Sequence, residues 1–243
     1  MGEVTTVADT ASPTYRAGET ASSDVAITRD RVRLAARLSF PGGEPPFPCV
    51  IFVHGLGSGK DSPRNTVIAA HLLDAGLATL LFDLSGHGES AADPGDGEEA
   101  YIQDLEAVFR WAARQPGVDS DRIGIAGSSL GGVIAVHAVC RHLIRPAAMV
   151  LRAPPVGPDD FVQLSVPSLA VIGSADPLLP GVRGAAGQSE AVTLCIVQGA
   201  GHLFEEPGTL QVALEKTVLW FQARLMNGKN EASEGPEPEA RDL

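Results

Sequence analysis

Short runs of apolar residues recur along the chain, and each is followed by glycine or a polar residue. Runs of this length that are apolar throughout are typical of strands covered by helices on both faces of a sheet. They therefore predict buried strands rather than strands with one face in solvent. The runs lie at 49–53, 78–82, 123–126, 147–151, 169–172 and 192–197.

The first strand-like segments show a different pattern. In 31–40, Val32, Leu34 and Leu38 alternate with charged or small residues, which predicts a strand with only one apolar face. The preceding segment, 24–28, is also strand-like. We expect the two to form an antiparallel pair that opens the sheet.

Segments with a helical pattern separate most of the apolar runs, at about 67–75, 98–114, 130–141 and 210–226. Alternating strands and helices predict an α/β fold: a doubly wound, mostly parallel sheet of about eight strands, with right-handed crossovers and helices on both faces. In such sheets, binding and catalytic residues gather beyond the carboxyl ends of the strands. The residues that follow each run are therefore the candidates for chemistry.

The two ends of the chain lack this pattern. Residues 1–22 hold few large apolar side chains and are expected to form a flexible arm, whereas 227–243 (NGKNEASEGPEPEARDL) are expected to form a disordered acidic tail. A length of 243 residues with 44% hydrophobic residues suits one globular domain. We assign that domain to 23–226.

Charge narrows the range of partners. The net charge of −12 disfavours binding to nucleic acid or to an anionic membrane.

Cys49, Cys140 and Cys195 lie far apart, without the spacing of a metal site or a disulfide framework, which favours free thiols in a reducing compartment. No leader pattern opens the chain, and no apolar run approaches the ~20 residues of a membrane span. We expect a cytoplasmic enzyme without metal or cofactor.

A G-x-S-x-G motif lies between a predicted strand and a predicted helix. It reads Gly127-Ser128-Ser129-Leu130-Gly131 and matches the sharp turn that exposes a nucleophilic serine. The residues two before and two after the nucleophile must be very small, because their side chains would collide in this turn. This requirement selects Ser129 over Ser128 as the nucleophile.

A serine nucleophile needs a base and an acid that orients the base. His202 lies on a glycine-flanked loop after the last apolar run, and Asp176 follows the run before it, so both fit the chain order Ser, Asp, His. Asp159 and Asp160 are alternative acids, because they follow the preceding strand. We predict that Ser129, Asp176 and His202 form a catalytic triad, with Asp176 preferred as the acid.

Two backbone N–H groups are candidates for an oxyanion hole, the pair of donors that stabilises the negative oxygen of an acyl-transfer intermediate. They belong to Leu130, after the nucleophile, and to Leu56, in the loop after 49–53. The same loop superficially resembles a phosphate-binding loop. That motif would need glycine at His54 and serine or threonine at Asp61, so nucleotide binding is disfavoured.

With these residues in place, the chain resembles the α/β-hydrolase superfamily over roughly 25–226. The stretch 83–90 (DLSGHGES) is similar to a turn common in esterases and lipases, and His87 within it is expected to be structural. Segments 54–65 (HGLGSGKDSPRN) and 199–207 (GAGHLFEEP) resemble the dienelactone-hydrolase-like branch. Dienelactone hydrolases proper use cysteine where this chain has Ser129, so lactone specificity is not carried over.

The resemblance implies a serine hydrolase, here a carboxylesterase that cleaves small acyl esters through an acyl-enzyme intermediate. The gap between Arg152 and Pro167 leaves no room for a large lid, which favours small, water-soluble esters. The same triad would also serve a thioesterase, an amidase or peptidase, or a lactone hydrolase. A non-catalytic binding protein of this fold is the alternative of another class. The expected partner is a small-molecule ester, and a homodimer is possible.

Overall fold

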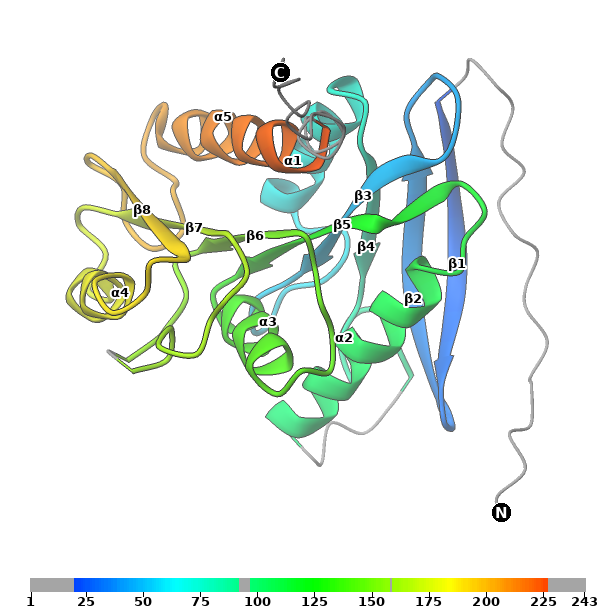
Figure 1. Ribbon diagram of the computed structural model, residues 1–243, viewed down its shortest axis with the longest axis horizontal. Coiled ribbons are helices and arrows are strands. Elements are labelled where there is room, and N and C mark those ends of the chain that lie inside the picture. The colour runs from blue at the N-terminus through cyan, green and yellow to red at the C-terminus, as the bar shows by residue number, and fades with distance from the viewer. Residues whose placement is uncertain (1–19, 92–96, 158, 227–243) are drawn as a thin grey trace, which may run out of the picture.

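The computed structural model describes residues 20–91, 97–157 and 159–226, which form a single mixed sheet with helices on both faces (Figure 1). The strands are β1 (Ala21–Arg29), β2 (Val32–Phe40), β3 (Phe47–Val53), β4 (Ala78–Phe82), β5 (Val118–Ser128), β6 (Ala148–Arg152), β7 (Ser168–Gly173) and β8 (Val192–Val197). The helices are α1 (Pro63–Asp74), α2 (Glu98–Ala112), α3 (Leu130–Cys140), α4 (Leu179–Ala186) and α5 (Thr209–Phe221), followed by a π-helical turn, η1 (Gln222–Met226).

The sheet has the order β1-β2-β4-β3-β5-β6-β7-β8. Strands β1 and β2 pair with each other and with β4 in antiparallel fashion, whereas all remaining pairs are parallel. The expected opening hairpin and the predicted eight-stranded, doubly wound architecture are confirmed. The carboxyl ends of β3 to β8 consequently lie along one edge of the sheet.

The central strands are buried as their apolar runs predict. Every residue of β3, β4 and β7 is buried. The apolar run 192–197 differs from the prediction, because β8 is an edge strand in which only Val197 is buried. Helices α2 and α3 contact each other on one face, and α1 contacts α5 on the other (Figure 1). The sheet between these layers forms the hydrophobic core, and its largest fully buried side chains include Phe82, Phe161 and Phe221.

Helix boundaries differ from the sequence prediction where proline and glycine are involved. Helix α1 begins at Pro63, before the expected start at Val67, because proline suits the first turn of a helix, where its missing N–H group costs nothing. The short helix α4 was not predicted at all, since its sequence LPGVRGAA contains one proline and two glycines. The predicted helix 210–226 is α-helical only to Phe221.

Within the described residues, the predicted boundary between the arm and the domain lies too late in the chain. Strand β1 begins at Ala21, so Ala21 and Ser22 belong to the sheet and not to the predicted arm. The remainder of the arm up to residue 19, and the predicted tail 227–243, lie outside the described residues. Within the described ranges, no helix combines the length and the apolar character that a membrane crossing requires.

Candidate active site

The predicted turn around Ser129 is present between β5 and α3. Ser129 has φ 49° and ψ −121°, a backbone conformation that is strained for any residue other than glycine. Its flanking glycines are sterically required. A Cβ atom at Gly127 would lie 2.6 Å from the carbonyl oxygen of Gly131, and one at Gly131 would lie 2.1 Å from that of Val53. The sequence therefore forces the hydroxyl of Ser129 to the carboxyl edge of the sheet.

The three residues predicted to form a triad lie together at this edge. Nδ1 of His202 is 2.8 Å from Oδ2 of Asp176, and Nε2 of His202 is 3.2 Å from Oγ of Ser129. Because a carboxylate only accepts hydrogen bonds, Nδ1 carries the imidazole proton and donates it to Asp176. Nε2 is then free to accept from the serine hydroxyl, as a general base must.

Asp176 is fixed on the loop that follows β7. Its side chain is fully buried, and Oδ1 accepts the N–H group of Leu178 at 2.9 Å while Oδ2 faces the imidazole. The alternative acids are engaged elsewhere or exposed: Oδ2 of Asp160 accepts the N–H group of Gly157 at 2.6 Å, and Asp159 is exposed. The structure therefore brings Asp176, and neither alternative, to His202.

The loop that carries His202 is held by contacts that sequence reasoning did not identify. The N–H group of Ala175 donates to the carbonyl of Ala200 at 2.9 Å, which ties this loop to the loop of Asp176. On its other side, Gly201 donates to a carboxylate oxygen of Glu206 at 3.0 Å, a bond that lowers the pKa of Glu206. Phe204 anchors the loop in the core at φ 54°. Glu206 and Phe204 lie within the segment 199–207, whose resemblance to dienelactone-hydrolase-like proteins could have indicated them in the sequence.

The two predicted oxyanion donors flank Ser129. Leu130 is the first residue of α3, so its N–H group has no partner within the helix. Leu56 lines the cleft beside Ser129, and its side chain is 74% exposed. The loop between β3 and α1 packs closely against the turn, since a Cβ atom at Gly55 would lie 3.3 Å from Cβ of Ser129. Neither N–H group donates a hydrogen bond within the described residues.

His54 has a structural role in the loop that follows β3. Its Nε2 accepts the N–H group of Leu84 at 3.0 Å, so Nδ1 carries the proton and donates to the carbonyl of Gly55 at 2.8 Å. Burial lowers the pKa of His54 and favours its neutral form. The ring also contacts His87, which itself bonds to the backbone of Ser85. Both ring nitrogens of His54 are thus occupied by backbone groups.

Asp83 joins the β3–α1 loop to the β4–α2 loop. Its carboxylate accepts the N–H group of Lys60, from the β3–α1 loop, at 2.6 Å, and that of Glu89, from the β4–α2 loop, at 2.9 Å. The ammonium group of Lys60 is nearly buried and lies 2.6 Å from Glu89 and 3.0 Å from Asp61. This lysine is therefore neutralised by carboxylates, which supports the sequence argument against a phosphate-binding loop.

A cleft of about 200 Å³ opens at Ser129 and His202. Its walls combine the exposed apolar side chains of Leu56 and Leu203 with small residues of the β3–α1 loop. Two arginines, Arg64 and Arg152, complete the lining, which contains no aspartate or glutamate among the described residues. The cleft is thus positively charged in an acidic protein. The two arginines were not singled out from the sequence.

Comparisons with known proteins agree with this architecture. A family model described as "Serine aminopeptidase, S33" matches residues 44–189. Dienelactone hydrolase from Anabaena variabilis superposes with a TM-score of 0.75 and is 28% identical, over 85% of this chain and 99% of that chain. An alpha-beta serine hydrolase homologue from Coxiella burnetii gives a TM-score of 0.71 and 27% identity, again over 85% and 99% of the two chains. The fold and superfamily expected from the sequence are confirmed.

Among curated proteins, the chain is similar to the "Putative phosphoribosyl transferase" of Mycobacterium tuberculosis. The two are 33% identical over 209 residues, which are 82% of this chain but 45% of the relative. The chain therefore spans less than half the length of that protein.

Proposed function

Because the chain belongs to the serine aminopeptidase (S33) family of α/β hydrolases, we propose that it is a serine carboxylesterase that cleaves small acyl esters through an acyl-enzyme intermediate. The observation that carries this proposal is the continuous hydrogen-bonded series from Asp176 through His202 to Ser129, which opens into the cleft. A buried acid, an oriented imidazole and a hydroxyl on a strained turn are the parts that activate a serine nucleophile.

In the proposed reaction, Oγ of Ser129 attacks the ester carbonyl while Nε2 of His202 takes its proton. Asp176 holds the imidazole and stabilises its charged form. His202 then gives the proton to the departing alcohol, which leaves an acyl group on Ser129. Water, deprotonated by the same imidazole, attacks the acyl-enzyme and releases the acid and the free serine.

The N–H groups of Leu56 and Leu130 are proposed to stabilise the negative oxygen of both tetrahedral intermediates. Two features support this role. The N–H group of Leu130 is an unpaired donor at the start of a helix, where the helix dipole also favours negative charge. That of Leu56 lies on the loop packed against the nucleophile.

Aminopeptidase activity is suggested by the family description but has less support from the cleft. An aminopeptidase must bind the ammonium group of a peptide N-terminus, for which a carboxylate is the natural partner. The described lining offers none, and Arg64 and Arg152 would repel the ammonium group. We therefore prefer an ester substrate and test amides and peptides as the alternative.

The test is a substrate panel of esters, thioesters, amides and lactones, combined with Ser129→Ala. We expect ester hydrolysis to be fastest, and Ser129→Ala to reduce kcat by at least ~10³-fold, the scale observed when a triad member is removed. Ser128→Ala is the matched control: it removes the adjacent hydroxyl, which has no hydrogen bond to His202. We expect it to lose less than about tenfold.

Labelling with a fluorophosphonate probe separates catalysis from mere binding. A working nucleophile at Ser129 should form a stable adduct, detectable by mass spectrometry, that is absent from Ser129→Ala. If the wild-type protein is not labelled and hydrolyses no member of the panel, the chain is a non-catalytic binding protein and the esterase proposal is wrong.

The setting of this activity is also a proposal. We place it in the cytoplasm, supported by three cysteines that all remain free in the structure. The partner is the small-molecule ester itself, without nucleic acid or membrane, and a homodimer stays a prediction.

A further inference from the structure

Arg152 is an unusual cation in this protein. It ends β6, its side chain is half-buried, and its carbonyl accepts the N–H group of Ser129 at 2.8 Å. Both residues line the same cleft. Its one side-chain hydrogen bond runs from Nη2 to Oδ1 of Asn65, a neutral group, at 2.7 Å. A guanidinium has five N–H donors, so most of its donor capacity is not used within the described residues.

The other buried or half-buried cations in the described chain have carboxylate partners. Arg29 lies 2.8 Å from Asp104, and Lys60 lies 2.6 Å from Glu89. Arg122 likewise lies 2.8 Å from Asp119. No carboxylate pairs with Arg152 within the ranges that the structure describes, although the chain carries a net charge of −12. Burying an unpaired charge is costly, and such charges are normally paired.

A second cation lies beside it. Arg64, on α1 next to Asn65, lines the same cleft, and its charge adds to burial in lowering the pKa of Arg152 to about 10. A pKa of about 10 still leaves the guanidinium group of Arg152 charged at neutral pH. The partner of Arg64 is Glu205 at 3.6 Å, whose side chain is 68% exposed and therefore strongly screened by water. The cleft thus holds two positive charges with little internal compensation.

The backbone next to Arg152 is also strained. Ala153, which lines the cleft, has φ 47° and donates its N–H group to Val171 at 2.8 Å. Strain of this kind at a non-glycine residue is concentrated at functional sites, where the surrounding structure maintains it. The turn at Ala153 fixes the end of β6, and with it the origin of the Arg152 side chain.

We propose that Arg152, assisted by Arg64, binds an anionic group of the substrate, so that the preferred esters carry a carboxylate close to the scissile bond. This inference rests on the proposed esterase function and specifies its substrate class. A carboxylate in the cleft supplies the counter-charge that Arg152 lacks and can accept two parallel N–H bonds from its planar guanidinium. The anionic group lies on either the acyl or the alcohol side of the ester, and the test distinguishes the two.

The first measurement uses pairs of esters of similar size, of which one member carries a carboxylate and the other does not. On the acyl side, 4-nitrophenyl hemiglutarate is compared with 4-nitrophenyl valerate. On the alcohol side, 4-acetoxybenzoate is compared with its methyl ester. We expect kcat/KM to favour the anionic member of at least one pair by about tenfold or more, because a site built for a polar group discriminates strongly against analogues that lack it.

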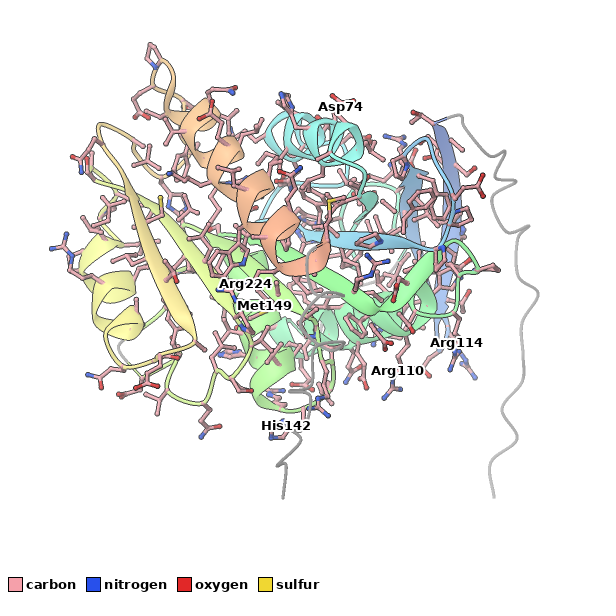
Figure 2. The ribbon with its side chains drawn as sticks, turned by 45° about the horizontal axis from the view of Figure 1, so that its top comes forward. Asp74, Arg110, Arg114, His142, Met149 and Arg224 are labelled. Carbon is pink, nitrogen blue, oxygen red and sulfur yellow. The ribbon has the colours of Figure 1, made fainter. Side chains whose placement is uncertain are left out.

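The variants assign the preference to Arg152. Arg152→Gln should abolish the preference, whereas Arg152→Lys, which keeps the charge, should retain part of it. Arg114→Gln is the matched control, since it removes the same charge from an exposed site just after α2, before β5 begins and far from the carboxyl edge (Figure 2). It should leave the preference intact. A preference that persists in Arg152→Gln would overturn the assignment.

A binding measurement separates failure of this inference from failure of the esterase proposal. Titration calorimetry with glutarate should show binding to the wild-type protein and to Arg114→Gln, weaker binding at high salt, and loss in Arg152→Gln. Equal or slower hydrolysis of both anionic esters, with hydrolysis still dependent on Ser129, overturns the anion site but not the esterase. Arg152-dependent glutarate binding without ester hydrolysis overturns the esterase proposal but not the anion site. Absence of both overturns both proposals.

Discussion

Two histidines near the carboxyl edge of the sheet differ in what their ring nitrogens contact. In His54, both nitrogens bond to the backbone, so the ring joins two loops and has no free site for a proton. In His202, one nitrogen faces the buried carboxylate of Asp176 and the other faces the hydroxyl of Ser129. The partners of each ring, rather than its position near the site, decide which histidine can act as a base.

The hydrogen bonds of His54 predict a pH dependence of stability. Burial lowers its pKa below the ordinary value of 6.5, and protonation would break the bond from Leu84, because a protonated nitrogen cannot accept. As the pH falls below 6.5, His54 takes up a proton in the unfolded chain but not yet in the folded chain. Stability therefore decreases as the pH falls towards the folded pKa.

Urea unfolding of the wild-type protein and of His54→Gln at about pH 7 and about pH 5.5 measures this contribution. We expect the wild-type protein to lose more stability between the two conditions than the variant does. Carboxylates with lowered pKa values, such as Asp61 and Glu206, act equally in both proteins and mainly at lower pH. An equal loss in the two proteins would contradict a buried, neutral His54.

At the scale of elements, the site depends on how closely α3 approaches β3. The backbone of Gly131 lies against the end of β3, and this approach aims the start of the helix at the cleft. Glycine is required there for space and not for an unusual φ value. The proposed nucleophile Ser129, the predicted donor at Leu130 and the close contact with β3 are therefore parts of a single structural unit.

Gly131→Ala should destabilise the fold by about 3 kcal/mol, because the added methyl group meets rigid backbone that cannot rotate away. Gly187→Ala is the control: it places a methyl group at the end of α4, where the nearest atoms lie 3.5 Å away at an ordinary φ value. The control should change stability by less than about 1 kcal/mol. Denaturant unfolding of both variants measures this difference. Equal losses in the free energy of unfolding would contradict the close contact between Gly131 and β3.

At the scale of the whole molecule, the described residues place no inserted helical layer between β6 and β7, over the cleft. The described part of the connection between β6 and β7 consists of turns and irregular segments. Superfamily members with a lid place it in this connection, and the expectation that a large lid is absent agrees with the structure here. The cleft of about 200 Å³ is consequently small and partly polar.

The small cleft predicts a limited acyl chain length. In a series of 4-nitrophenyl esters from acetate to decanoate, we expect kcat/KM to be highest for the short acyl groups and to fall by about tenfold or more for the longest. The large apolar side chains that line the described cleft are those of Leu56 and Leu203, which leaves little apolar surface for a long chain. Wild-type kinetics across the series are sufficient, and a maximum at long chains would reject the proposal of small ester substrates.

The features predicted best from the sequence are those fixed by local sterics or by strand ends. Gly127 and Gly131 identified the turn at Ser129 because no larger residue fits there. Asp176 and His202 were found because each follows an apolar run whose carboxyl end lies at the same edge. Arg152 also follows such a run directly, so the same rule would have identified it.

Other features depend on tertiary contacts and could not be predicted from pattern alone. Helix α4 forms although its sequence is a poor helix former, because Val182 and Ala185 are buried against the end of the sheet. The pairing of Asp83 with two loops, and the lack of a partner for Arg152, emerge only when distant segments are brought together. The sequence shows these residues, but not which of them contact each other in the folded chain.

The carboxylate of Asp83, shared between the β3–α1 and β4–α2 loops, has a consequence for the timing of catalysis. The loop carrying Leu56 is already hydrogen-bonded to the neighbouring loop. Substrate binding should therefore cost little additional conformational entropy in this loop. An incoming ester would meet a receptor that is already assembled, and binding energy need not be diverted into building it. Such an enzyme should bind its substrate in a preformed site, without a preceding conformational change.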